Sequence, residues 1–167
     1  MNVLREQKNV IGLPLPNETC LVMDDVLPRL ELITGSFVLA FQEDQLLLTN
    51  LAERGWDIPG GHVEAGETPI EAMKRELYEE TRVLVESPQL LGYERIRLFT
   101  KPNNYKYPYP DSYMVFYCAK IIQLDPFEST IESKGRGLFK PEEAYKIPWV
   151  QGNSFFYEEA RRRVMGG

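Results

Sequence analysis

The sequence predicts a single domain of mixed α/β class, in which strands and helices are interleaved along the chain. Its length of 167 residues fits one domain, and 43% apolar against 26% charged residues can build a core. Runs rich in β-branched and aromatic residues are separated by glycine- and proline-containing turns and by amphipathic segments. We therefore expect residues 1–167 to form one domain.

The first half of the chain predicts peripheral strands followed by a buried hairpin. Residues 3–32 alternate weakly between apolar and polar side chains and contain three prolines, which favours one or two strands at the edge of a sheet. The apolar runs at 36–41 and 46–49 are separated by the polar turn 42–45. This pattern is typical of a hairpin with buried strands.

The second half predicts two strands and two helices. Residues 90–99 and 112–122 are rich in strand-forming side chains, and a Tyr/Pro/Lys loop at 101–110 separates them. The 112–122 run is apolar on both faces, as a central strand would be. Pro141 is placed to open one helix, and residues 154–164 predict another that ends in three arginines, which suit a helix C-terminus.

Composition narrows the functional class. The net charge of −6 has the wrong sign for binding long nucleic acids through bulk electrostatics. The longest apolar run, 113–119, is far too short for a membrane span, and residues 1–10 lack the apolar region of a signal peptide. We expect a soluble, cytoplasmic protein with no membrane partner.

The few cysteine and histidine residues exclude several kinds of site. Cys20 and Cys118 have no C-x-x-C spacing, so we expect two reduced structural thiols rather than a disulfide framework or a zinc site. His62 is the single histidine and lies far in sequence from both cysteines, which argues against Cys-His and Ser-His-Asp centres. Any chemistry must therefore come from carboxylates.

The clearest helix begins at a capping box. Thr68-Pro69-Ile70-Glu71 places a capping threonine before a proline at the first helical position, with a glutamate that reaches back to the threonine amide. The helix should run to about Thr81. Ile70, Met73 and Leu77 then form a narrow apolar stripe that would face the sheet.

Three glutamates share the helix face beside this stripe. Glu76, Glu79 and Glu80 are spaced i, i+3, i+4. A solvated charged face is the ordinary explanation of such a run. However, Glu76 and Glu80 repel each other, and Glu79 and Glu80 lie in the last turn, where the helix dipole disfavours anions. A divalent cation such as Mg²⁺ would remove this repulsion, so the pattern favours a metal site.

These residues match a known family motif. The segment 61–83 resembles the Nudix box, G-x5-E-x7-R-E-U-x-E-E-x-G-U, where U is an aliphatic residue. The matching residues are Gly61, Glu67, Arg75, Glu76, Leu77, Glu79, Glu80 and Val83. Resemblance to Nudix hydrolases implies an α/β/α sandwich around a mixed β-sheet. It also implies Mg²⁺- or Mn²⁺-dependent cleavage of a nucleoside diphosphate linked to another moiety.

The resemblance also implies roles for individual residues. Glu76, Glu79 and Glu80 would be metal ligands or, for one of them, the base that activates water. In MutT-like members Glu76 would be that base, and Glu79 and Glu80 would bind metal together with the backbone carbonyl of Gly60. The metal would neutralise phosphate charge and lower the pKa of a bound water.

The remaining box residues would support these carboxylates. Arg75 is spaced to hold a carboxylate in place, with Glu67 as a further supporting residue, although an ordinary surface ion pair is the alternative. Gly60 and Gly61 would let the backbone approach ligands closely, which is compatible with a simple tight turn.

One box position departs from the motif. Arg82 stands where the box has glycine, and a left-handed residue there costs about 1 to 2 kcal/mol if it is not glycine. No metal ligand is lost. We expect activity to survive with a changed helix end, and a weakened or inactive member is the alternative.

Substrate recognition must come from outside the box. Glu132 resembles the downstream glutamate that supplies a further metal ligand in MutT-like enzymes, and a solvated loop acid is the alternative. Lys134 and Arg136, as cations on a flexible loop, are candidates for contacting a triphosphate. Asn153 resembles the asparagine that reads an oxidised guanine in that subfamily, or it simply caps the last helix.

Other sequence features bear weakly on the substrate. Tyr105, Tyr107 and Tyr109 in the 101–110 loop could stack on a base or close over the core. The chain lacks the S-Q-P-W-P-F-P-x-S array of NADH-cleaving members and the proline some fifteen residues past the box of ADP-ribose cleavers. Both observations slightly favour nucleoside triphosphates.

The sequence therefore predicts a MutT-like pyrophosphohydrolase that converts a nucleoside triphosphate, with an oxidised purine as one option, to a nucleoside monophosphate and pyrophosphate. The partner would be a small nucleotide, and the sequence leaves open whether the protein is a homodimer. Two alternatives are a Nudix module that binds a nucleotide without cleaving it and a pyrophosphohydrolase acting on RNA 5′ ends.

Overall fold

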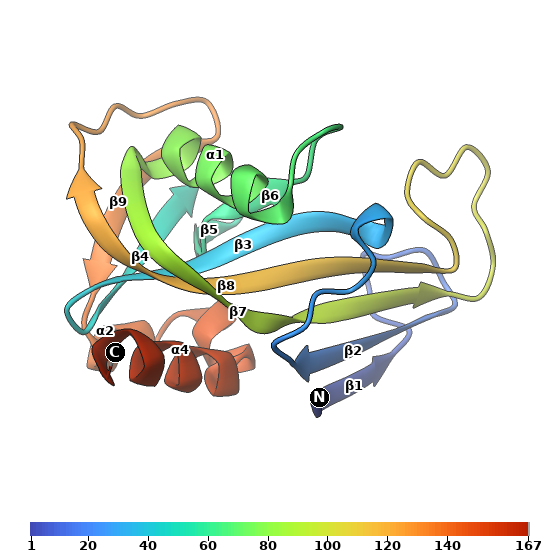
Figure 1. Ribbon diagram of the computed structural model, residues 1–167. Coiled ribbons are helices and arrows are strands. Elements are labelled where there is room, and N and C mark those ends of the chain that lie inside the picture. Colours follow the sequence, from blue (N-terminus) through green and yellow to red (C-terminus); the bar gives the residue numbers. More distant parts are fainter. Residues whose placement is uncertain (167) are drawn as a thin grey trace.

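A computed structural model describes residues 1–166, which contain one mixed sheet of nine strands (Figure 1). The strands are β1 (Asn2–Lys8), β2 (Asn17–Met23), β3 (Ile33–Gln42), β4 (Gln45–Leu51), β5 (Gly55–Asp57), β6 (Gly60–His62), β7 (Val83–Leu98), β8 (Asp111–Leu124) and β9 (Ser133–Phe139). The helices are α1 (Pro69–Thr81), α2 (Pro141–Ala144), α3 (Pro148–Gly152) and α4 (Ser154–Gly166), with a 3-10 turn at Leu30–Leu32. In Figure 1, α1 lies on one face of the sheet and α2 and α4 lie on the other, which confirms the α/β/α sandwich.

The centre of the sheet is the parallel pair β3 and β8, whereas the other pairings are antiparallel. The order of the strands is β1-β2-β7-β8-β3-β4-β5, with β6 pairing β3 and β9 pairing β4. The expected peripheral strands of residues 3–32 are β1 and β2, at one edge. The expected central strand is β8, which runs between β7 and β3.

The expected hairpin is present but short. Strands β3 and β4 pair only at Phe41↔Leu46 and Gln42↔Gln45 beside their turn. The first half of β3 instead pairs with β6, where Gly35–Phe37 lies opposite Gly60–His62. This arrangement places Gly60 and Gly61, where the box begins, in the middle of the sheet.

Two expectations about strands need correction. Residues 132–139 were expected to be a flexible loop, but 133–139 form β9 because they pair with β4 along its length. The strand expected at 90–99 begins at Val83, directly after α1. The pairing of β7 with β8 changes register between Glu86 and Gln89, where Ser87 has φ 52°. This irregularity interrupts the alternation of apolar side chains, so the first half of β7 has no clear strand pattern in the sequence.

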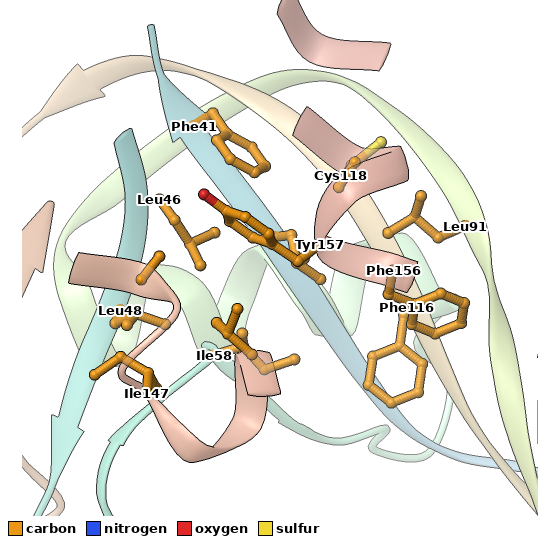
Figure 2. Close-up of a cluster of buried hydrophobic side chains, with 14 of the residues drawn as sticks. Phe41, Leu46, Leu48, Ile58, Leu91, Phe116, Cys118, Ile147, Phe156 and Tyr157 are labelled. Atoms are coloured by element: carbon orange, nitrogen blue, oxygen red, sulfur yellow. The ribbon is translucent and has the colours of Figure 1, made fainter. Parts of the chain in front are cut away.

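Each face of the sheet packs its own core. Side chains alternate along β3, so Val38 and Ala40 pack in the cluster under α1. Leu39 and Phe41 pack in the cluster under α4, where Figure 2 shows Tyr157 lying among the apolar side chains that surround it. Burying each large apolar side chain stabilises the fold by roughly 1.5 to 3 kcal/mol.

Helix α1 has the bounds that its capping signals predict. The Thr68 hydroxyl accepts from the Glu71 amide at 3.1 Å, and the Glu71 carboxylate accepts from the Thr68 amide at 2.9 Å. Met73 and Leu77 are buried, which confirms two members of the apolar stripe. Ile70 is 36% exposed, so its assignment to the buried stripe is wrong.

The end of α1 also differs from expectation. Arg82 keeps the left-handed backbone of the box glycine, with φ 60° and ψ 34°, and its amide donates to the Tyr78 carbonyl at 2.9 Å. Its guanidinium lies 5.3 Å from the centre of the Tyr78 ring. The substitution therefore leaves the helix end unchanged, contrary to the expectation of an altered one.

The C-terminal helices cover the second face. Helix α2 opens at Pro141 and α4 runs from Ser154, as the sequence predicts, while α3 was not expected. Glu159 on α4 pairs with Arg162 and Arg163. No helix within residues 1–166 is long and apolar enough to cross a membrane.

Candidate active site

The box glycines and the helix glutamates face each other. The Gly60 amide on β6 donates to Glu80 Oε1 at 2.9 Å. A Cβ atom built on Gly61 would lie 2.6 Å from Glu76 Cδ, closer than real side chains approach. Any larger residue at position 61 would therefore displace the Glu76 carboxyl group, which explains the glycine in physical terms.

Arg75 ties the loop before α1 to the helix. Its Nε donates to Glu67 Oε2 at 2.7 Å, and its Nη2 donates to Glu67 Oε1 and the His62 carbonyl, both at 3.0 Å. Its Nη1 donates to Glu76 Oε1 at 3.0 Å. The bidentate contact lowers the pKa of Glu67. Arg75 thus fixes the position of the Glu76 carboxylate relative to the box loop.

Burial makes two of the carboxylates costly to ionise. Glu80 is 5% exposed, and removal from water raises its pKa to about 7, although the hydrogen bond from Gly60 opposes this shift. Burial also raises the pKa of Glu76, against the stabilising charge of Arg75. Glu79 differs because its side chain is 58% exposed. Glu80 and Glu76 are therefore carboxylates that a bound cation would stabilise.

Glu76, Glu80 and Glu132 line one cavity of about 400 Å³, together with Gly60 and Gly61. We call this the carboxylate cavity. Glu132 enters it from the segment before β9, where its backbone carbonyl accepts from the Ala52 amide at 2.8 Å. The structure thus brings Glu132 to the box, although it lies 51 residues after Thr81, the last residue of α1.

The donor set of this cavity fits a divalent cation in its chemistry. Carboxylate oxygens are the ligands that Mg²⁺ and Mn²⁺ prefer, and no ion pair within residues 1–166 includes buried Glu80, which accepts a hydrogen bond from the Gly60 amide. Within residues 1–166, no three acidic, histidine or cysteine side chains are already arranged as a metal site. Glu76 and Glu79 both contact Arg75, at 3.0 and 3.4 Å, and Glu79 is largely exposed, so the ligands would have to rotate to converge.

The expected substrate-binding residues lie in three different places. Lys134 is exposed on β9 and is not part of the carboxylate cavity. Arg136 is on the same strand, where its Nη1 donates to the Thr81 carbonyl at 2.7 Å, so it contacts the end of α1. The structure does not bring these two cations to the glutamates, and their roles in substrate binding remain predictions.

Asn153 lines a second cavity of about 290 Å³, which we call the aromatic cavity. Its lining includes Phe116 and Trp149. The Asn153 amide is held from both ends, since Oδ1 accepts from Arg5 at 3.2 Å and Nδ2 donates to the Trp149 carbonyl at 2.9 Å. This side chain faces Arg5 rather than capping α4.

The two cavities adjoin each other and share lining residues. Phe37, Arg54 and Met114 line both of them. Sequence reasoning missed these three residues, because β3, β8 and the turn before β5 meet only in the folded sheet. No local motif marks them.

The tyrosine loop reaches the box from the far end of the sheet. The Tyr107 ring stacks on His62, with centroids 6.0 Å apart and planes at 7°, and its hydroxyl lies 3.1 Å from Nε2. His62 lines the carboxylate cavity. The loop therefore closes against one rim of the site rather than over either core.

Comparison with known proteins places the chain in a family. The NUDIX domain matches residues 32–160, which include the box and both cavities' central strands. The fold and the box geometry agree with this match, and the chain belongs to the NUDIX domain family.

Two relatives with related names resemble this chain. A segment of 56 residues is 46% identical to an RNA pyrophosphohydrolase of Xanthomonas oryzae pv. oryzae (strain MAFF 311018), and covers 33% of this chain. The match spans only 27% of that relative's length. The Bacillus subtilis pyrophosphohydrolase BsRppH has 26% identity and a TM-score of 0.68, over 94% of this chain and 98% of that one.

A third structure supports the fold alone. The MutT protein from Bacillus halodurans has 23% identity and a TM-score of 0.56, over 76% of this chain and 80% of that one. The similarity to BsRppH covers a larger share of this chain, 94%, than the matched domain at residues 32–160 does.

Proposed function

We propose that this protein is a metal-dependent pyrophosphohydrolase that cleaves a phosphoric anhydride bond of a nucleoside triphosphate, releasing a nucleoside monophosphate and pyrophosphate. The observation that carries this proposal is the carboxylate cavity, where Glu76, Glu80 and Glu132 meet beside the Gly60-Gly61 pair. Membership in the NUDIX domain family and the names of both pyrophosphohydrolase relatives support the same reaction.

The proposal assigns roles to the carboxylates. Glu79 and Glu80, with the Gly60 carbonyl and Glu132, would hold Mg²⁺ or Mn²⁺, and Glu76 would be a ligand or the general base. When bound, the metal neutralises phosphate charge and acidifies a coordinated water. As the base, Glu76 would accept a proton from the attacking water, and burial, which raises its pKa, would make it a stronger base.

Arg75, Glu67 and Gly61 act by positioning. The Arg75 guanidinium holds the Glu76 carboxylate at 3.0 Å and is itself fixed by Glu67 and the His62 carbonyl. Gly61 leaves the space that the Glu76 carboxyl occupies. Asn153 would contact the nucleobase in the aromatic cavity, since that cavity adjoins the carboxylates and offers aromatic faces for a base.

A second candidate substrate is the triphosphorylated 5′ end of RNA. The name of the Xanthomonas relative favours it. The cleaved bond would be the same, because the terminal nucleotide of such an RNA carries the same triphosphate. The net charge of −6 argues against a long RNA track but not against binding of an end.

A substrate panel tests the proposal. Purified protein with Mg²⁺ or Mn²⁺ is incubated with nucleoside triphosphates, including oxidised purine ones, sugar nucleotides, dinucleotides and 5′-triphosphorylated RNAs of increasing length, and products are separated by ion-exchange chromatography. We expect pyrophosphate and a 5′-monophosphate. Turnover that rises with RNA length would select the RNA candidate, and saturable binding without any product would select a non-catalytic nucleotide-binding module.

The proposal extends to the setting of the enzyme. We place it in the cytoplasm, where Cys20 and Cys118, both buried and unpaired, would stay reduced. Size-exclusion chromatography with light scattering decides between a monomer and a homodimer. Activity restored by Mg²⁺ or Mn²⁺ after chelation identifies the metal.

A further inference from the structure

Arg54 stands at the junction of the two cavities. It lies in the turn between β4 and β5, and its side chain lines both the carboxylate cavity and the aromatic cavity. It forms an ion pair with Asp57, but Nη1 lies 3.6 Å from Oδ2, longer than a normal hydrogen bond. With 63% of the side chain exposed, this pair holds the guanidinium weakly.

The carboxylate cavity lacks other cations that are free to meet a substrate. Three glutamates line this cavity. Among residues 1–166, Arg54 is the only arginine or lysine that lines it. Arg75 is already engaged by Glu67, Glu76 and the His62 carbonyl. Arg136 contacts the end of α1 instead. A polyphosphate entering this cavity therefore meets Arg54 as its available protein cation.

The position of Arg54 also agrees with the direction that a nucleotide would take. If the cleaved phosphates lie by the glutamates and the nucleoside lies in the aromatic cavity, the phosphate chain has to pass the residues common to both. Those residues are Phe37, Arg54 and Met114, and of these only the guanidinium can bind a phosphate oxygen. Arginine is well suited to this role because its planar fork binds two oxygens at once.

We propose that Arg54 binds the phosphate chain of the substrate at the passage between the two cavities, exchanging its weak contact with Asp57 for phosphate oxygens. This inference rests on the proposed function, because it assumes a nucleotide with its phosphates at the carboxylates. It adds a substrate-binding residue that lies outside the box and has no recognisable motif.

The test compares Arg54→Gln and Arg54→Lys with a matched control, Arg29→Gln. Arg29 is also an exposed arginine in an ion pair, with Glu31, but it lines neither cavity. Steady-state kinetics with the best triphosphate of the panel give KM and kcat. Isothermal titration with ATP and GTP analogues carrying methylene bridges in place of the anhydride oxygens, and with the uncharged nucleosides, gives Kd in the presence of Mg²⁺.

We expect Arg54→Gln to raise KM and the analogue Kd about tenfold or more, since it removes a charge-assisted contact with phosphate. Arg54→Lys should recover part of this loss, whereas Arg29→Gln should behave as wild type. The melting temperature and the nucleoside Kd should not change. Unchanged analogue binding in Arg54→Gln, or an equal loss for nucleosides, would overturn the inference.

The two proposals fail separately. Absence of turnover by the wild-type protein would contradict the proposed function. The analogue titrations would still decide whether Arg54 binds the phosphate chain, because they do not depend on cleavage. If neither analogue binds to the wild type, Arg54 has no phosphate ligand and the inference is wrong.

Discussion

Replacing Glu80 with glutamine is expected to stabilise the metal-free protein at alkaline pH. Glu80 is 5% exposed, and burial raises its pKa to about 7 from an ordinary value of 4.5. The difference corresponds to about 3 kcal/mol at pH 8, which is the cost of ionising this group in the folded protein. Glutamine keeps the shape and the oxygen that accepts from Gly60, but it carries no charge.

The sign of the pH dependence follows from linkage. Between pH 4.5 and about 7 the folded protein holds a proton on Glu80 that the unfolded chain releases, so this group lowers the free energy of unfolding as pH rises through that window. Above pH 7 its cost is constant. Glu80→Gln should therefore equal wild type in stability near pH 4.5 and exceed it at pH 8.

Thermal unfolding with a chelator present measures this effect. A gain of about 3 kcal/mol corresponds to roughly 6 to 12 °C for a chain of this size. Glu79→Gln is the matched control, because its side chain is 58% exposed and should change stability little. The argument from burial would be refuted if Glu80→Gln were less stable than wild type at pH 8. It would also be refuted if the variant were more stable by the same amount at every pH.

Three further substitutions test the supporting structure. Arg75→Lys should lower the free energy of unfolding by about 1 to 3 kcal/mol and slow hydrolysis, because lysine cannot reproduce the bidentate contact with Glu67. Urea denaturation measures the stability, and initial rates measure the hydrolysis. Unaltered rates would contradict the positioning role. Thr68→Ala removes the cap of α1 and should lower the free energy of unfolding by about 1 kcal/mol, as measured by thermal unfolding, while kcat stays nearly constant. A large fall in kcat would contradict a purely structural role for Thr68. Arg82→Gly relieves the left-handed strain but also increases the conformational entropy of the unfolded chain, so it should change the free energy of unfolding by less than about 1 kcal/mol. Calorimetry measures this change. A marked loss of stability would show that the contact of Arg82 with Tyr78 outweighs the strain.

Local signals explain what the sequence could predict. Helix α1 begins where Thr68, Pro69 and Glu71 indicate, because a capping box acts over three residues. The acids Glu76 and Glu80 could be recognised as strained partners from their spacing alone. The structure then shows them lining one cavity.

Non-local contacts explain what the sequence could not predict. Residues 133–139 contain glycine and charged side chains, and they become a strand only because β4 offers its edge. Arg136 was therefore assigned to a loop, although its side chain contacts Thr81 at the end of α1. Arg54 and Asn153 both line the aromatic cavity, yet they lie about a hundred residues apart in sequence.

The most direct test of the central claim is the initial rate of triphosphate cleavage by wild type and Glu80→Gln, side by side, with Mg²⁺. The claim is that buried carboxylates of α1 hold the metal that makes this fold a pyrophosphohydrolase. It predicts turnover by wild type and a rate at least about a hundredfold lower in the variant, although the variant is the more stable protein at alkaline pH without metal. Equal rates in both proteins, or no cleavage by wild type of any substrate in the panel, would contradict it.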